Sequence, residues 1–233
     1  MRTLLDIVRD RRSARGPYDP GRAVPQPALA DILEAARWAP TAHNMQNFGI
    51  IVVEDPALLA RIGTIRSTPS LTFLRENYRQ LAFSEEELRR RGTGLLASQF
   101  PPSWRRPDVT PEEALDPARA TLAAVLGHCP TLLVVVCDER QRAPASEGDV
   151  LGMMSLGCVL QNMWLTAEAH GLGLHVLSTL ASATVEPELR ALLALPPGIR
   201  IAFGCRLGYP APGTQDGPRV RRELARIVHH DRY

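Results

Sequence analysis

The spacing of apolar residues predicts two amphipathic helices at the start of the chain. Leu4, Ile7 and Val8 recur at helical spacing, and Gly16-Pro17 predicts the end of this first helix, because proline cannot continue a helix. A second helix is predicted from about Pro27, and Pro40 ends it. Its charged residues face outward, and its inward face is formed by Leu29, Ile32, Leu33 and Ala36.

Four short apolar runs predict the strands of one sheet. The runs 48–53 and 131–137 are continuous and rich in β-branched residues, so both are expected to be strands buried on their two faces. The runs 174–177 and 199–207 predict two further strands. Between the second helix and the first strand lies a polar loop, residues 39–47.

The longest predicted helix runs from Asp149 to His170, and Gly171 is expected to cap its C-terminus. Its apolar residues do not form a single stripe, because Val159 and Trp164 lie away from the face that is formed by Met153, Leu156, Leu160 and Met163. A helix that is apolar most of the way round is buried on most sides, either in a core or in a subunit interface.

The region 67–127 is more charged than its surroundings, and its pattern is mostly helical. Ser84 with Glu87, and Thr110 with Glu113, have the spacing of capping boxes and predict two helix starts. We therefore expect one domain over residues 1–233, with 67–127 as a mostly helical insertion or lid. A chain of 233 residues that is 45% hydrophobic is long enough to bury one substantial core.

The composition excludes several kinds of chemistry. All 27 basic residues are arginine, so mechanisms that need a lysine amine, such as a Schiff base, are excluded. A net charge of +2 gives no reason to expect a nucleic-acid partner.

The runs 48–53 and 131–137 are far shorter than the roughly 20 residues of a membrane-spanning helix. Four widely separated cysteines fit reduced, buried thiols, so a soluble cytoplasmic protein is expected.

Arginines gather near both ends of the chain, and the first cluster has the chemistry of a phosphate site. Arg11, Arg12, Ser13 and Arg15 lie within five residues, and their guanidinium and hydroxyl groups can form charge-assisted hydrogen bonds to a phosphate. The same arginines also suit a solvated helix end, where cations interact with the helix dipole. The second cluster is in the C-terminal tail and includes Arg219 and Arg221.

Two further segments offer groups that could bind a ligand. Thr41, His43, Asn44 and Gln46 place a hydroxyl, an imidazole and two amides in one loop, and amides match the mixed donor and acceptor edge of a flavin's pyrimidine ring. A plain surface loop would also be polar. The glycines at 171 and 173 could let the backbone approach a ligand, but a helix cap explains Gly171, and a dinucleotide-binding fingerprint is absent because position 176 is valine.

In order and spacing, these segments resemble the nitroreductase family of FMN proteins. The resemblance is carried by R-R-S-x-R at 11–15, A-P-T-x-x-N-x-Q at 39–46, the strand 50–53 with Glu54-Asp55, Gln161-Asn162 in the helix 152–169, Gly171-Leu172-Gly173, Gly208-Tyr209-Pro210 and the basic tail. It implies an α+β sandwich, with a central, mainly antiparallel sheet flanked by helices. It also implies a homodimer that holds two tightly bound FMN molecules at the subunit interface.

The resemblance assigns roles to residues of this chain. Arg11 and Ser13, with Arg12 nearby and Arg219 and Arg221 from the tail, would hold the FMN phosphate. Arg15 would lie at the flavin N1/O2 edge and favour the reduced anion electrostatically. Three further groups would border the flavin: Thr41, His43, Asn44 and Gln46, with Thr41 contributed across the dimer, and the backbone of Leu177, Ser178 and Thr179.

The activity that the resemblance implies is a two-step hydride transfer. NAD(P)H reduces flavin N5, and a small organic acceptor such as a nitroaromatic or a quinone then takes the electrons, so the protein needs no acid, base or nucleophile of its own. An FMN-dependent dehydrogenase or dehalogenase for one metabolite, and a non-catalytic flavin-binding protein, remain alternatives. Threonine at 41, Asn47-Phe48 and Ser178-Thr179 depart from the family pattern and leave the acceptor open.

Overall fold

The structure is a computed structural model that describes residues 2–67, 76, 80–99, 121–214 and 217–233. The chain forms two compact units: residues 1–67 with 121–214, and residues 68–120 with 215–233. The first unit contains the sheet and most of the candidate site.

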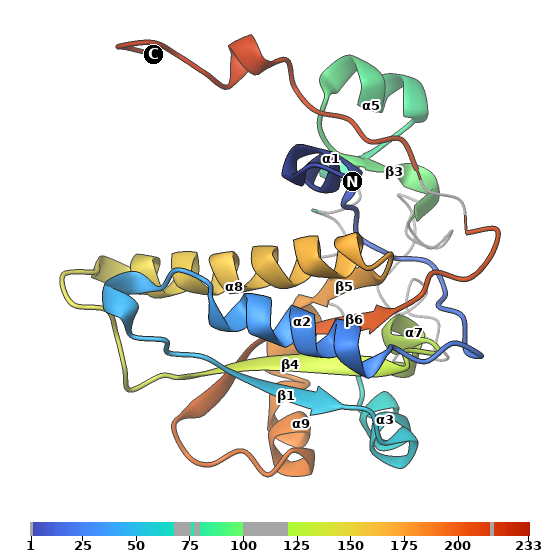
Figure 1. The fold of residues 1–233 in the computed structure, drawn as a ribbon, viewed down its shortest axis with the longest axis vertical. Helices are drawn as coiled ribbons and strands as arrows, with labels where there is room; N and C mark the ends of the chain where they lie inside the picture. Colours follow the sequence, from blue (N-terminus) through green and yellow to red (C-terminus); the bar gives the residue numbers. More distant parts are fainter. Residues whose placement is uncertain (1, 68–75, 77–79, 100–120, 215–216) are drawn as a thin grey trace. The chain divides into compact units, whose positions relative to one another are not determined.

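A four-stranded antiparallel sheet forms the centre of the first unit (Figure 1). Its order is β1 (Gly49–Val53), β4 (Thr131–Asp138), β6 (Ile199–Gly208) and β5 (Gly173–Leu177). Strand β4 is central and buried along almost its whole length, as predicted. Strand β1 pairs with β4 alone, so it is an edge strand with mostly half-buried side chains. The expectation that residues 48–53 are buried on both faces was therefore wrong.

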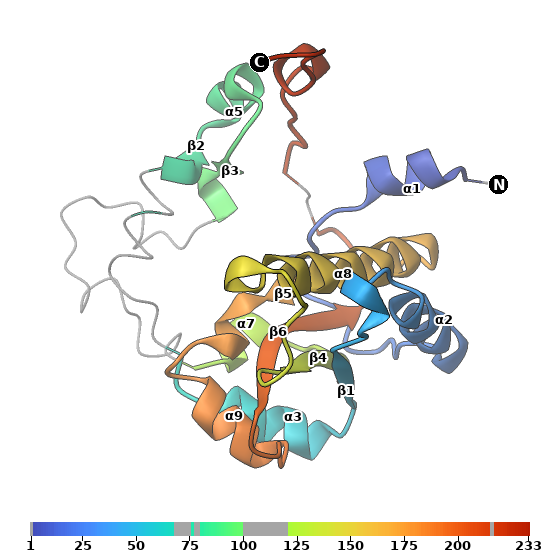
Figure 2. The same ribbon diagram turned by 90° about the vertical axis from the view of Figure 1, so that its left-hand side faces the viewer.

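Helices cover both faces of this sheet (Figures 1 and 2). On one face, Leu133 and Val135 of β4 pack with α2 (Gln26–Arg37) and α8 (Val150–Ala169). On the other face, Leu132 and Val134 pack in a cluster with residues of α3 (Pro56–Gly63), α7 (Ala123–Leu126) and α9 (Glu186–Leu192). The alternation of side chains along a strand produces these two cores, and the predicted α+β sandwich is confirmed.

Helix α8 buries a narrower face than its composition suggests. Val159, Met163 and Ala167 are its buried residues, while Val150, Met153 and Met154 near its start are 56%, 65% and 62% exposed. Met153 therefore lies outside the face that α8 buries within its own chain. The helix ends as predicted, because Gly171 has a φ of +70° and its N–H bonds to the carbonyl of Glu168.

Residues 147–169 are long and apolar enough to cross a membrane by length and composition, which was not expected from the sequence. A helix in the core of a soluble protein meets the same criteria; α8 packs along α2, although only 17% of its apolar window is buried in the single chain. Asn162 of α8 donates a hydrogen bond of 2.9 Å to the carbonyl of Ala35 in α2. The length of α8 is thus weak grounds for a membrane span.

The first helix, α1 (Leu4–Asp10), is shorter than predicted and ends before the arginine cluster begins. Thr3 and Asp6 form its capping box. None of its residues is buried, and the apolar side chains of Leu4, Leu5 and Val8 are exposed. The apolar face that predicted this helix is therefore largely exposed to solvent in the single chain.

The second unit contains α5 (Glu85–Arg91), two short parallel strands, β2 (Ala82–Phe83) and β3 (Leu95–Leu96), and the described part of the tail. Ser84 caps α5 by accepting a hydrogen bond from the N–H of Glu87, as predicted. The expected helix start at Thr110 lies outside the described residues. The strands were not expected, and the role of 67–127 as a lid stays a prediction.

Candidate functional site

The arginine segment, residues 11–15, leaves α1 in an extended conformation and lies against the start of β5. Ser13 forms a parallel bridge with Leu174, and the N–H of Ala14 donates a 3.1 Å hydrogen bond to the carbonyl of Leu174. The segment thus adds a short stretch of parallel pairing to the free edge of β5. Its backbone is fixed by pairing with the sheet and is not a solvated helix end. This favours a binding role for its side chains.

Gly173 permits this close approach. A Cβ atom on Gly173 would lie 2.6 Å from Cβ of Ala14 and 3.2 Å from the ring of Tyr18. Such contacts are too short for any side chain to occupy without moving its neighbours. The second glycine of Gly171-Leu172-Gly173 therefore makes room for the arginine segment and not for a ligand.

Helix α8 holds the other side of the arginine segment. The guanidinium of Arg11 lies 4.3 Å from the centroid of the Trp164 ring, a cation–π contact. The indole N–H of Trp164 donates a 3.0 Å hydrogen bond to the carbonyl of Arg12. One tryptophan therefore orients an arginine side chain and the adjacent main chain together.

Arg206 of β6 lies behind the arginine segment, and sequence reasoning missed it. It is only 4% exposed, and its Nη2 donates to the carbonyls of Ala14, Arg15 and Gly16 at 3.0, 2.7 and 2.8 Å. Its Nη1 donates to the carbonyl of Leu126 at 3.3 Å. The clue in the sequence is an arginine with apolar neighbours on both sides, near the end of the run 199–207, because arginine is almost never buried without polar partners.

His175 of β5 lies beside Arg206 and was also missed. Its Nδ1 accepts a 3.2 Å hydrogen bond from Nε of Arg206, so the ring proton is assigned to Nε2. Burial, and then the positive charges of Arg206 and Arg15, lower the pKa of His175 to about 3. The imidazole is therefore neutral near pH 7 and adds no charge to the site.

The loop that contains the second predicted group, Thr41 to Gln46, has a strained backbone. His43, Asn44 and Gln46 have φ values of +51°, +53° and +50°, a backbone conformation that residues other than glycine rarely adopt. The hydroxyl of Thr41 accepts a 3.1 Å hydrogen bond from the N–H of Gln46 and closes the loop. Strained residues of this kind concentrate at functional sites, which favours a binding role over a plain surface loop.

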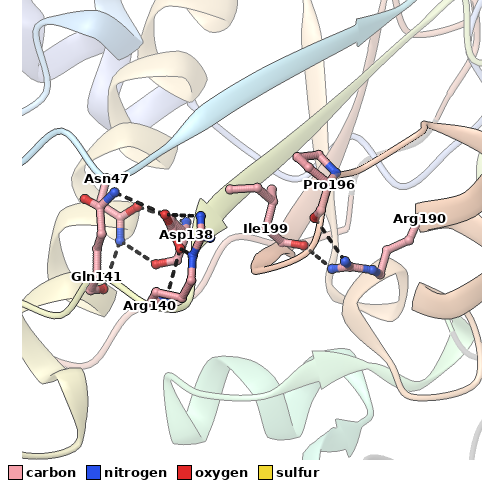
Figure 3. A network of polar contacts seen from close by, with 7 residues as sticks. All are labelled: Asn47, Asp138, Arg140, Gln141, Arg190, Pro196 and Ile199. Carbon is pink, nitrogen blue, oxygen red and sulfur yellow. Dashed lines mark hydrogen bonds and ion pairs between the residues drawn. The ribbon is translucent and has the colours of Figure 1, made fainter.

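Asn47 anchors the end of this loop (Figure 3). Its side-chain amide donates to the carbonyls of Asp138 and Gln141 at 3.0 and 3.1 Å and accepts from the N–H of Asp138 at 2.9 Å. The departure from the family pattern at position 47 therefore ties the loop to the end of β4. A pocket next to the loop is lined by several residues, including Thr41, Met45, Phe48, Gly152 and Ser155.

The arginine segment and the loop contact opposite halves of α8. Arg11 packs on Trp164, whereas the N–H of Ala42 donates a 2.9 Å hydrogen bond to the hydroxyl of Ser155. Nine residues separate Ser155 from Trp164, which is about 13 Å along a helix. Within one chain the two predicted groups are therefore not brought together, as expected if one of them serves a second subunit.

The remaining predicted residues lie in two places. Leu177 ends β5, and Ser178 and Thr179 begin a short 3-10 helix beyond it, where the Thr179 hydroxyl lies 3.1 Å from that of Ser67. Arg219 and Arg221 belong to the second unit, where a Cβ on Gly92 would meet the carbonyl oxygen of Arg221 at 2.8 Å. The meeting of the tail arginines with Arg11 and Ser13 stays a prediction.

The chain offers few groups for other chemistry. In the part of the chain that the structure describes, no group of three histidine, cysteine or carboxylate side chains is placed to hold a metal ion. The four cysteines are free thiols, three of them buried and Cys158 half-buried. Burial raises the pKa of Cys129 to about 11, so this thiol is not a nucleophile near neutral pH.

Residues 8–209 match the model of the nitroreductase family. The chain belongs to this family, as its arginine segment, its strained loop and its sheet indicate.

Solved structures of the family have the same fold. A nitroreductase with bound FMN from Bacteroides fragilis is 21% identical, with a TM-score of 0.60 over 96% of this chain and 97% of that one. A nitroreductase family protein from Clostridium difficile is 18% identical, with a TM-score of 0.61 over the whole of both chains. An NADPH-dependent oxidoreductase from Staphylococcus epidermidis is 23% identical over 87% of this chain, which spans only 63% of that relative's length.

The neutral state of His175 predicts how stability depends on pH. An unfolded histidine takes up a proton near pH 6.5, whereas folded His175 stays neutral until its pKa of about 3. Protonation therefore favours the unfolded state, and stability falls as the pH drops below 6.5.

His175→Gln keeps an acceptor for Arg206 but cannot titrate. We expect the unfolding free energy of the wild type to fall by about 1–2 kcal/mol more than that of the variant between pH 7 and 5. Urea unfolding at both pH values measures this, and an equal loss in both proteins would contradict it.

Proposed function

We propose that this chain is an FMN-dependent NAD(P)H oxidoreductase that acts as a soluble, cytoplasmic homodimer on a small organic acceptor. Membership of the nitroreductase family supports the class of reaction, and the NADPH-dependent relative supports the nucleotide donor. The observation that carries the proposal is the arginine segment, which is fixed between β5 and α8 with the guanidinium of Arg11 held on the Trp164 ring.

The residues of the arginine segment fit the phosphate of FMN. Guanidinium groups and a hydroxyl are the donors that bind a phosphate most strongly, through charge-assisted hydrogen bonds. In our proposal Arg11 and Ser13 hold the phosphate, with Arg12 beside them. Arg219 and Arg221 reach it from the tail. Because Ser13 is paired with the sheet and Arg11 with Trp164, little side-chain freedom is lost when the phosphate binds.

The flavin ring would lie along β5 from the arginine segment to the end of the strand. When bound, FMN accepts hydride from NAD(P)H at N5 and passes it to the acceptor. Arg15 provides a cation at the N1/O2 edge, where negative charge develops on reduction. The backbone of Leu177, Ser178 and Thr179 borders N5 and O4. Since His175 is neutral, Arg15 and Arg206 supply the positive charge on this side.

A second copy of the chain completes the site in this proposal. The strained loop that holds Thr41, His43, Asn44 and Gln46 lies about 13 Å along α8 from the arginine segment. In an antiparallel pairing of two α8 helices, the loop of one protomer approaches the arginine segment of its partner. The exposed apolar side chains at the start of α8, and those of α1, supply apolar surface for such a contact.

Cofactor content and turnover test the proposed function. Purified protein, loaded with FMN if necessary, should be yellow and should oxidise NADPH or NADH faster when a quinone or a nitroaromatic is added. The cofactor is identified after extraction, and turnover is followed by nucleotide absorbance. A chain that takes up FMN but oxidises neither nucleotide with any acceptor would contradict the proposal and favour a metabolite-specific or non-catalytic flavoprotein.

The two arginine clusters should separate into two roles. Arg15→Ala removes the cation at the N1/O2 edge, so it should slow the reduction of bound flavin more than it weakens FMN binding. Arg219→Ala should do the reverse, because it removes a phosphate partner. A lost charge-assisted bond corresponds to about a tenfold to hundredfold change. Stopped-flow reduction and fluorescence titration with FMN measure the two effects, and equal effects of both variants on both quantities would reject this division.

The exposed start of α8 should form the dimer contact. Met153→Asp places a charge on a surface that the partner buries, so we expect a monomer that binds FMN at least about tenfold more weakly, because a buried unpaired charge is strongly unfavourable. Light scattering gives the mass, and Val125→Asp, at an exposed apolar residue of α7 on the other face of the sheet, is the control. A dimeric Met153→Asp protein with normal FMN binding would contradict this interface.

A further inference from the structure

The buried Arg206 has main-chain carbonyls where a buried cation usually has carboxylates. In the described part of the chain, its hydrogen-bond acceptors are the carbonyls of Ala14, Arg15, Gly16 and Leu126 and the imidazole of His175. A buried ion must keep polar partners, since leaving it without them is strongly unfavourable. The carbonyls therefore cannot turn away from Arg206 unless the guanidinium becomes accessible to water.

The arrangement of these carbonyls shapes the chain. Three successive carbonyls, from Ala14 to Gly16, point at the same nitrogen, so the backbone curls around the guanidinium with Arg15 in the middle of the curl. On one side of the curl, Ser13 is paired with Leu174 of β5. The direction in which the Arg15 side chain leaves the backbone is thus set by Arg206.

Further contacts fix Arg206 itself. Its guanidinium lies 4.8 Å from the centroid of the buried Tyr18 ring, and the Tyr18 hydroxyl donates a 3.1 Å hydrogen bond to the carbonyl of Arg206. Its Nε donates a hydrogen bond to Nδ1 of His175, whose ring faces the same side of the sheet. Every group of the guanidinium therefore has a partner in the first unit, and the arginine has no freedom to reorient when a ligand binds.

We propose that Arg206 is a positioning residue of the cofactor site, which holds residues 13–16 in the conformation that presents Ser13 to the FMN phosphate and Arg15 to the flavin ring before FMN binds. The proposal rests on the proposed function for the identity of the ligand. Arg206 touches neither the phosphate nor the ring in this arrangement. It acts through the backbone of the residues that do.

Two substitutions and a matched control separate positioning from packing. Arg206→Lys keeps the charge but cannot direct planar donors to five acceptors, and Arg206→Gln also removes the charge. The control is Arg190→Gln, because Arg190 also donates to main-chain carbonyls, those of Pro196 and Ile199 (Figure 3). Ile199 is at the start of β6, whereas Arg206 lies near its end. All three variants are compared with the wild type in thermal unfolding, so that any loss of stability is known.

The first measurement uses the protein without FMN. Hydrogen exchange should show that the amides of residues 13–16 exchange at least about tenfold faster in Arg206→Lys than in the wild type. The reason is that losing the hydrogen bonds of Arg206 makes local opening of this segment easier. Exchange in β4 should be unchanged. Arg190→Gln should leave residues 13–16 as protected as in the wild type.

The second measurement uses the loaded protein. Both Arg206 variants should bind FMN at least about tenfold more weakly and lower the preference for reduced over oxidised flavin about tenfold, which is a reduction potential about 30 mV more negative. Arg190→Gln should match the wild type in both quantities even if it unfolds earlier. A role in packing alone lowers stability but leaves the potential of bound flavin unchanged.

Each other outcome overturns the proposal. Unchanged exchange at residues 13–16, or Arg206 variants whose FMN affinity and potential match those of Arg190→Gln, would make Arg206 a core residue only. Failure of both Arg206 variants to fold would assign it to folding. A wild-type chain that binds no FMN would remove the proposed function, while the exchange measurement would still decide whether Arg206 holds residues 13–16.

Discussion

A guanidinium inside a protein core needs a complete set of hydrogen-bond acceptors, and the set around Arg206 joins elements that are far apart in the sequence. Its acceptors come from the segment after α1, from the end of α7 and from β5. Satisfying this one cation therefore fixes the loop that carries Arg15 against the sheet. The apolar residues on both sides of the sheet stabilise the sandwich, and Ala14 and Tyr18 of this segment pack in one of these clusters. A buried polar group that is fully bonded can also specify where the loop lies, because every alternative position of the loop leaves it unsatisfied.

The periodicity of the sequence predicted the main strands and helices, because burial repeats along each element, and the family resemblance implied the sandwich that they form. The continuous run 131–137 became the buried central strand, and Gly171 ended α8 with a positive φ. The edge position of β1 could not be predicted in the same way, since the run 48–53 is equally apolar and only pairing decides which strand lies at the edge. The buried side of α8 could not be predicted either, because a helix that is apolar on several sides does not indicate which side packs on its own chain.

The candidate site was predictable where residues of one kind cluster in the sequence and not where they meet through the fold. The arginine segment and the loop around Thr41 were found because their polar groups lie within a few residues of one another. Arg206 and His175 were missed because each is an isolated polar residue with apolar neighbours on both sides, and only the pairing of β5 with β6 brings them together. The sequence left open that Gly173 gives room to a ligand, and the structure shows that it gives room to Ala14.

The same contacts explain how a chain without lysine could support flavin chemistry. A lysine ammonium can lose its proton when it is buried, whereas a guanidinium keeps its charge in all conditions that a protein meets. Positive charge can therefore be placed deep behind the proposed flavin ring without depending on pH. His175 would add a charge that varies with pH, but burial, and then the charges of Arg206 and Arg15, lower its pKa and keep it neutral. The positive charge at the proposed N1/O2 edge then comes from guanidinium groups, which would favour the reduced anion electrostatically.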